Sequence, residues 1–120
     1  MTKMISLTKY EHQVVPKFRD QLNQAESVED VKKFFIATTQ ELLSLATEGS
    51  LSVDYDDISL LPGQTPSYSL SSQVIDDASF KKLANSDLDA VMGRLSEQAS
   101  NHHTHLMKNN TKTKLKIKNH

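Results

Sequence analysis

Residues 27–49 read SVEDVKKFFIATTQELLSLATEG, and this stretch decides the class of fold. Its apolar side chains recur at steps of three and four, which is the spacing of one face of a helix. Ser27 is a good N-cap, Asp30 follows it as in a capping box, and Gly49 supplies a stop. The stretch predicts a helix with an apolar face wide enough for burial on more than one side. That face comprises Val28, Val31, Phe35, Thr38, Leu42 and Leu45, flanked by Phe34 and Leu43.

The segments on both sides of this helix also have helical spacing. Residues 6–25 repeat apolar side chains at steps of three and four, with Pro16 in the middle. Because proline lacks a backbone donor and clashes with the preceding turn, we expect a new helix to begin with Pro16 in its first turn, rather than one kinked helix. A short helix is expected at residues 78–84. A longer one is expected after Ser86, with a face of Leu88, Val91, Met92, Leu95, Ala99 and Leu106.

Residues 50–75 have a different character. Apolar and polar residues alternate from Leu51 to Asp56, which is the period of a β-strand. Pro62-Gly63 then marks a turn, and the alternation resumes at residue 68. These signals predict a hairpin of residues 51–56 with 68–74, with an irregular loop as the alternative.

Together these elements predict a mainly α fold: a small three- to four-helix bundle with a short extended or β-hairpin element near 51–74 and a basic C-terminal tail. A length of 120 residues fits one domain of common size. We expect a single helical domain over 1–107. Residues 108–120 are expected to form a basic tail that is either disordered or docked as a strand.

Composition limits the class of protein. Hydrophobic residues make up 37% and aromatic residues 6%, so the core is expected to be thin, with part of the chain uncovered, tail-like or completed by a partner. The sequence has no cysteine, which excludes disulfides, thiolate nucleophiles and Cys-ligated zinc. No apolar run approaches the roughly 20 residues that span a bilayer, and the first 25 residues lack the apolar centre of a signal peptide. A soluble cytoplasmic protein with no membrane partner is expected.

Charge is strongly segregated along the chain. Residues 34–80 contain seven acidic residues and no Lys or Arg, whereas residues 81–120 contain eight bases and three acids. Lysines alternate with Thr, Leu or Ile over residues 112–118, which is an amphipathic strand pattern. If both alternating segments were strands, they could pair with apolar faces matched and charges opposed. The charged residues of that predicted contact are Asp54, Asp56, Lys114 and Lys116.

Candidate residues for chemistry are few. His102, His103 and His105 lie close together, and His102 and His105 would share a helix face. A zinc site normally needs three protein ligands in tetrahedral geometry, so we expect no metal, with weak binding by this His cluster as the alternative. The sequence contains no Gly-x-Ser-x-Gly elbow and no phosphate-binding loop. No catalytic residue and no cofactor are therefore expected.

The sequence thus favours a small non-enzymatic protein that acts in protein–protein interaction and self-associates. Its partner is expected to be a second copy or another protein. Nucleic-acid binding through the lysine-rich tail is an alternative that we do not favour, because lysines without Arg or aromatic residues give only salt-sensitive attraction to phosphates. The predicted contact faces are Val31, Phe35 and Leu42 on one helix, and Leu88, Val91 and Leu95 on another.

Overall fold

The structure is a computed structural model that describes the backbone of residues 5–118 and the side chains of residues 5–108. The chain is mainly helical with a small antiparallel hairpin, which confirms the predicted class of fold. In chain order the elements are α1 (Thr8–Gln24), α2 (Val28–Ala46), the 3-10 helix η1 (Tyr55–Asp57), β1 (Ile58–Leu60), β2 (Tyr68–Leu70), α3 (Ser72–Ile75), α4 (Ala78–Lys81) and α5 (Leu88–Lys118).

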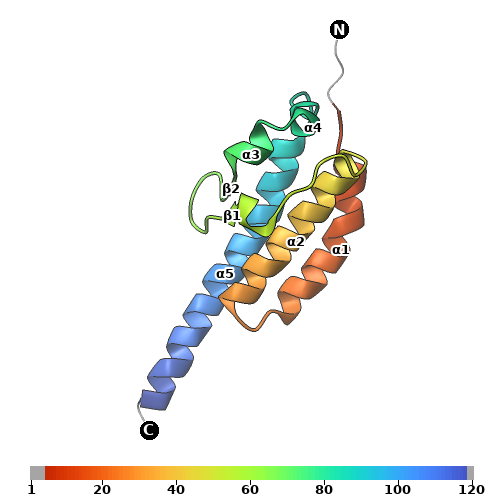
Figure 1. The fold of residues 1–120 in the computed structure, drawn as a ribbon. Helices are drawn as coiled ribbons and strands as arrows, with labels where there is room; N and C mark the ends of the chain where they lie inside the picture. Colours follow the sequence, from red (N-terminus) through yellow and green to blue (C-terminus); the bar gives the residue numbers. More distant parts are fainter. Residues whose placement is uncertain (1–4, 119–120) are drawn as a thin grey trace.

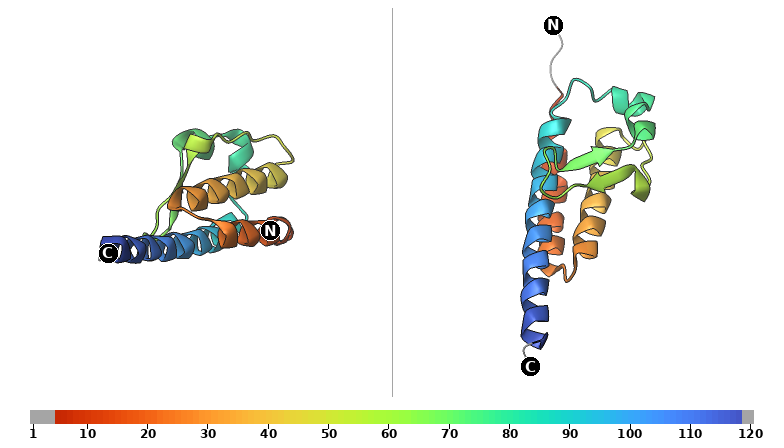
Figure 2. Two further views of the ribbon diagram at one scale, coloured as in Figure 1. Left: turned by 90° about the horizontal axis from the view of Figure 1, so that it is seen from below. Right: turned by 90° about the vertical axis from the view of Figure 1, so that its left-hand side faces the viewer.

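Three long helices form the body of the molecule. α1, α2 and α5 pack against one another, and α5 runs past the other two at its C-terminal end (Figure 1). The hairpin lies across α2 and α5, with α3 and α4 beyond it, so that these short elements cover a different face of α2 from the one that contacts α1 (Figure 2). A single apolar core joins all of these layers.

α2 is the central element, as its sequence indicated. The Asp30 N–H donates to the Ser27 hydroxyl at 3.2 Å, and the Asp30 carboxylate accepts the Glu26 N–H at 3.1 Å. These two bonds satisfy N–H groups at the start of the helix. Beyond the last turn Gly49 has φ +81°, a left-handed conformation that favours glycine. The helix therefore has the predicted beginning and the predicted stop.

α1 differs from its prediction. Pro16 lies inside one continuous helix, so the expected new helix with Pro16 in its first turn is wrong. The Pro16 side chain is exposed, while Glu11, Val14 and Phe18 on both sides of it are buried. Burial of one face along the whole helix compensates for the backbone hydrogen bond that proline removes.

The hairpin is also shifted from its predicted position. β1 is Ile58–Leu60 rather than residues 51–56, and it pairs with β2 in the register Ile58↔Leu70. Residues 51–54 are irregular because their backbone bonds to α2: the Gln40 amide donates to the Val53 carbonyl at 2.8 Å. Leu51 still enters the core, so the alternation there reflects burial without a strand.

The start of α5 is tied to the start of α1. The Asp87 carboxylate accepts the Leu7 N–H at 2.7 Å, and the Asp87 N–H donates to the Ile5 carbonyl at 3.1 Å. This contact joins residues 80 positions apart in sequence, which is beyond the reach of any local pattern. The helix expected at residues 78–84 is shorter, since α4 covers Ala78–Lys81, and α3 before it was not predicted.

α5 is unbroken through residue 107, where the sequence suggested the start of a separate tail. The backbone of residues 112–118 continues α5 as a helix. The side chains of residues 109–118 lie outside the described residues, so the expectation of a basic tail that is disordered or docked as a strand stays a prediction. The segment predicted as its partner strand, residues 51–56, is irregular as far as residue 54 and then enters η1. Within residues 5–118, no helix combines the length and apolar character needed to cross a bilayer.

Candidate functional site

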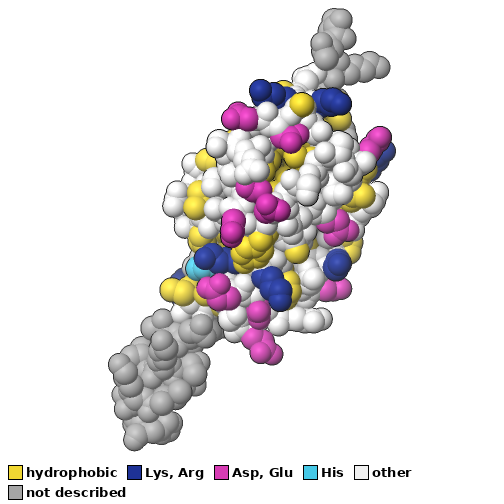
Figure 3. Space-filling view, viewed as in Figure 1, with side chains coloured by type: hydrophobic (Ala, Val, Ile, Leu, Met, Phe, Trp, Pro, Cys, Tyr) yellow, Lys and Arg dark blue, Asp and Glu magenta, His cyan; other side chains and the backbone are white. Residues whose placement is uncertain are grey.

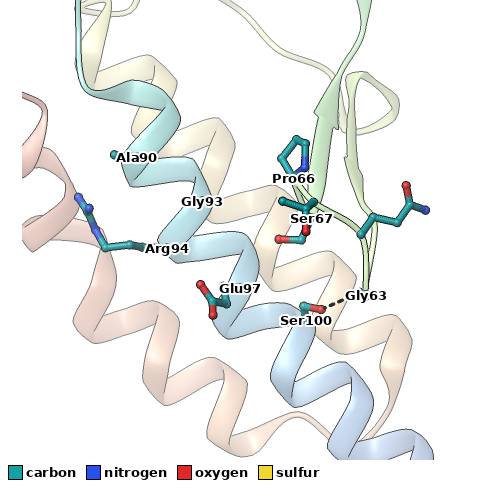
Figure 4. Close-up of a pocket in the computed structure, with 10 residues that line it drawn as sticks. Gly63, Pro66, Ser67, Ala90, Gly93, Arg94, Glu97 and Ser100 are labelled. Carbon is teal, nitrogen blue, oxygen red and sulfur yellow. Dashed lines mark hydrogen bonds between the residues drawn. The ribbon is translucent and has the colours of Figure 1, made fainter.

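A groove of about 600 Å³ lies along α5. One wall is the loop between β1 and β2, and the floor and other wall belong to α5 (Figure 4). We call this surface the α5 groove. It is lined by Gly63, Gln64, Thr65, Pro66, Ser67, Ala90, Gly93, Arg94, Glu97 and Ser100.

Arg94 forms the edge of the α5 groove that faces α1. Its Nε and Nη2 atoms donate to the two carboxylate oxygens of Glu11, both at 2.7 Å. The Glu11 side chain is only 9% exposed, whereas that of Arg94 is 52% exposed. The hydrogen bond to Glu11 raises the pKa of Arg94 above its ordinary value. This bidentate ion pair links α1 to α5 and fixes the position of the guanidinium.

Hydroxyl groups hold the opposite wall against α5. Ser67 and Ser96 share a hydrogen bond of 2.6 Å between their Oγ atoms, and the Gly63 N–H donates to the Ser100 Oγ at 3.2 Å. Gly63 has φ +82°, so the turn at the tip of this loop requires a residue that adopts the left-handed region easily. The loop is thus fixed to α5 at two places along the groove.

The floor of the α5 groove is a helix surface without large side chains. Ala90 is exposed, and a Cβ atom built on Gly93 would meet no described atom within 4 Å. Glycine inside a helix costs about 1 kcal/mol relative to alanine. The packing of the described residues gives no compensating reason for this glycine.

Tyr68 and Asp89 lie beside the groove. The Tyr68 hydroxyl donates to the Asp89 Oδ1 at 3.3 Å. Partial burial, the nearby Asp89 carboxylate and this hydrogen bond raise the pKa of Tyr68 to about 12. The phenol therefore stays protonated at neutral pH and links β2 to the first turn of α5.

The apolar residues predicted as contact faces lie inside the body. Val31, Phe35, Leu42, Val91 and Leu95 have no measurable exposure, and Leu88 is 5% exposed. In this conformation they pack within one chain, so they offer no surface to a second copy. The wide apolar faces that suggested self-association pack instead against the neighbouring helices and the hairpin of the same chain.

The histidines do not come together as a ligand set. His102 and His103 are partly buried and His105 is exposed, all on α5. Among the described residues, no group of three His, Cys, Asp or Glu side chains is arranged to hold a metal ion. His102 instead lines a separate hollow of about 290 Å³ with Arg19, Leu22, Asn23, Gln98 and Asn101.

The predicted acidic contact has a different local role. Asp54 caps η1, and its N–H donates to the Asp57 carboxylate at 3.0 Å. Asp56 lines a second groove of about 390 Å³ between α2 and β1, beside the exposed Tyr55. Residues 51–56 are not a strand, so the strand expected there is wrong, whereas the predicted contact of these acids with lysines stays a prediction. The side chains of Lys114 and Lys116 lie outside the described residues.

The sequence patterns did not reveal the α5 groove. In the sequence, the floor of the groove is visible only as one glycine in a helical segment. Glu11 and Arg94 are 83 positions apart, so no local pattern connects them. The one signal available was Gly93 itself, an unfavourable residue in the middle of a well-formed helix. No protein-family model, no curated protein and no solved structure matches this chain.

Proposed function

We propose that this chain is a non-catalytic protein–protein interaction module whose binding surface is the α5 groove. The observation that carries the proposal is the open floor at Gly93. A helix surface without a side chain lets another backbone approach closely, and the described part of the chain leaves that space unused. The cost of the glycine is then offset when a partner is bound.

The chemistry of the lining supports a polypeptide partner. The hydroxyls of Ser67, Ser96 and Ser100 already take part in hydrogen bonds within the chain, and the Arg94 guanidinium is bound to Glu11. The groove therefore presents small side chains together with the half-exposed guanidinium of Arg94 and the carboxylate of Glu97. From Ala90 to Ser100 this face is about 15 Å long at 1.5 Å per residue, which is close to three helical turns.

Site-specific photo-cross-linking tests the proposal in the cells that make this protein. A photoreactive residue at Ala90 lies in the groove, and a matched control at Ala37 lies on an exposed face of α2. Position 90 is expected to give protein adducts, of this chain or of another, that position 37 does not give. Equal protein adducts at both positions would contradict the proposal.

Nucleic-acid binding is the competing function, and the same experiment separates the two. Five lysines lie between residues 108 and 118, beyond the body of the molecule. Against this, all 15 acidic residues of the chain lie at or before Glu97, and acidic side chains spread over the face shown in Figure 3, around α3 and α4 and near the start of α2. Adducts with nucleic acid alone would favour the competing function and refute the proposal.

A further inference from the structure

α5 extends beyond the body that supports it. Among the side chains that the structure describes, Leu106 is the last apolar one of α5 that packs against the core, and the helix continues to Lys118. We call residues 107–118 the α5 overhang. It is about 18 Å long at 1.5 Å per residue. Figures 1 and 2 show it running past the turn between α1 and α2, where no other helix or strand of residues 5–118 lies beside it.

The overhang and the α5 groove lie on one helix and have similar lengths. The groove positions Ala90, Gly93, Glu97 and Ser100 follow one another at steps of three and four. The same steps lead to Thr104 and to Met107, which is 51% exposed. One face of α5 therefore passes without interruption from the groove to the overhang. Because the helix is straight, the overhang points away from the groove of its own chain (Figure 2).

Charge changes sign along this helix. The groove half carries the acids Asp89 and Glu97, with Arg94 already bound to Glu11. The overhang half carries five lysines between residues 108 and 118 and no acid. Two such helices side by side in the same direction would bring lysines against lysines. In opposite directions each lysine-rich half lies against an acidic half, which is favourable and steers association.

We infer that the occupant of the α5 groove is the overhang of a second copy of this chain, in an antiparallel dimer. With residue 118 of one copy opposite residue 90 of the other, residue 108 lies opposite residue 100, and the two-fold axis passes near Thr104. Each copy then fills the groove of its partner, and the symmetric contact closes without leaving a free site. This inference rests on the proposed function, because it assigns the partner of the same groove.

Sedimentation equilibrium of the full chain is the first test. The expected result is a species of twice the 13.5 kDa chain mass that dissociates as salt is raised. A species of one chain mass at every concentration up to the millimolar range, at low salt, would overturn the inference. If Ala90 still gives adducts with a different protein, the proposed function stands and only the second copy is wrong.

A blocked groove tests the location of the contact. Gly93→Gln places a side chain in the groove where no described atom lies within 4 Å of the new Cβ, so folding should be kept and the melting temperature raised. Association is expected to weaken by roughly tenfold or more, which corresponds to about 1.4 kcal/mol. The matched control Ala37→Gln adds the same side chain on the exposed face of α2 and should leave association unchanged. A dimer that Gly93→Gln leaves intact would refute the groove as its interface.

A charge exchange tests the antiparallel direction. In this register residue 111 lies opposite Glu97, and Lys108 lies within one turn of residue 111 on the same face. Glu97→Lys and Lys108→Glu, each alone, are expected to weaken the dimer, because each brings like charges close to one another in both halves. A mixture of the two variants should restore association, since both contacts between the different chains then pair a lysine with a glutamate. Failure of the mixture to associate better than either variant would exclude this register.

Discussion

Substitution of Arg94 should destabilise the chain more than substitution of Glu11, although the two residues form one pair. Arg94→Met removes two hydrogen bonds of 2.7 Å and leaves a carboxylate whose side chain is 9% exposed. Glu11→Met leaves a guanidinium whose side chain is 52% exposed and can be hydrated. The unequal exposure of the two partners therefore predicts unequal losses.

The magnitude follows from the same exposures. Breaking a fully buried ion pair costs about 3–5 kcal/mol, and exposed pairs contribute about 0–1 kcal/mol. Because one partner is buried and the other is half exposed, we expect a loss of about 2–3 kcal/mol for Arg94→Met. We expect a loss of about 1 kcal/mol for Glu11→Met. The double variant leaves no unpaired charge, so its loss should be smaller than the sum of the single losses by about 1–2 kcal/mol.

Urea unfolding followed by circular dichroism measures these differences as shifts in the transition midpoint at constant slope. Methionine is used because it keeps the length and the helix propensity of both positions. The protein concentration is kept low so that association does not add to the apparent stability. Arg19→Met, at an exposed position of α1, is the matched control and should change the unfolding free energy by less than about 0.5 kcal/mol. Equal losses for Arg94→Met and Glu11→Met, or additive losses in the double variant, would refute the reasoning.

Four further predictions concern single positions. Asp89→Asn should lower the pKa of Tyr68 from about 12 towards its ordinary value of 10, as seen by ultraviolet titration of the phenol with Tyr68→Phe as the reference; an unchanged titration would contradict the role of Asp89. Because the folded chain holds the Tyr68 proton more tightly than the unfolded chain, its contribution to stability is complete below pH 10 and is lost as the pH rises through about 12, which urea unfolding across that range checks. Phe35→Ala should reduce the unfolding free energy by about 3–5 kcal/mol, because Phe35 is fully buried in the core, and a loss below about 1 kcal/mol would show that the site collapses around the cavity. Gly49→Ala should destabilise by about 1 kcal/mol, because φ is +81° there, and a stabilised variant in thermal unfolding would show that the turn had rearranged.

Local patterns were sufficient for the helical class of the chain. The apolar spacing and the capping residues of α2 act within a few positions of one another, so Ser27, Asp30 and Gly49 have the roles that the sequence predicted. The apolar face of α5 follows for the same reason. The sequence also contained the glycine at position 93 and the separation of acids from lysines. These are the two features on which the proposals depend.

Tertiary structure decided everything that depends on distant residues. Whether Pro16 interrupts a helix depended on the burial of Glu11, Val14 and Phe18 against other elements. Whether Leu51–Asp56 formed a strand depended on a hydrogen bond from Gln40 in α2. The α5 groove exists only because Glu11 meets Arg94 across 83 positions and because the β1–β2 loop is bonded to Ser96 and Ser100. Such contacts form where burial of apolar surface brings remote segments together. The periodicity of a single segment does not indicate which distant segments will pack against it.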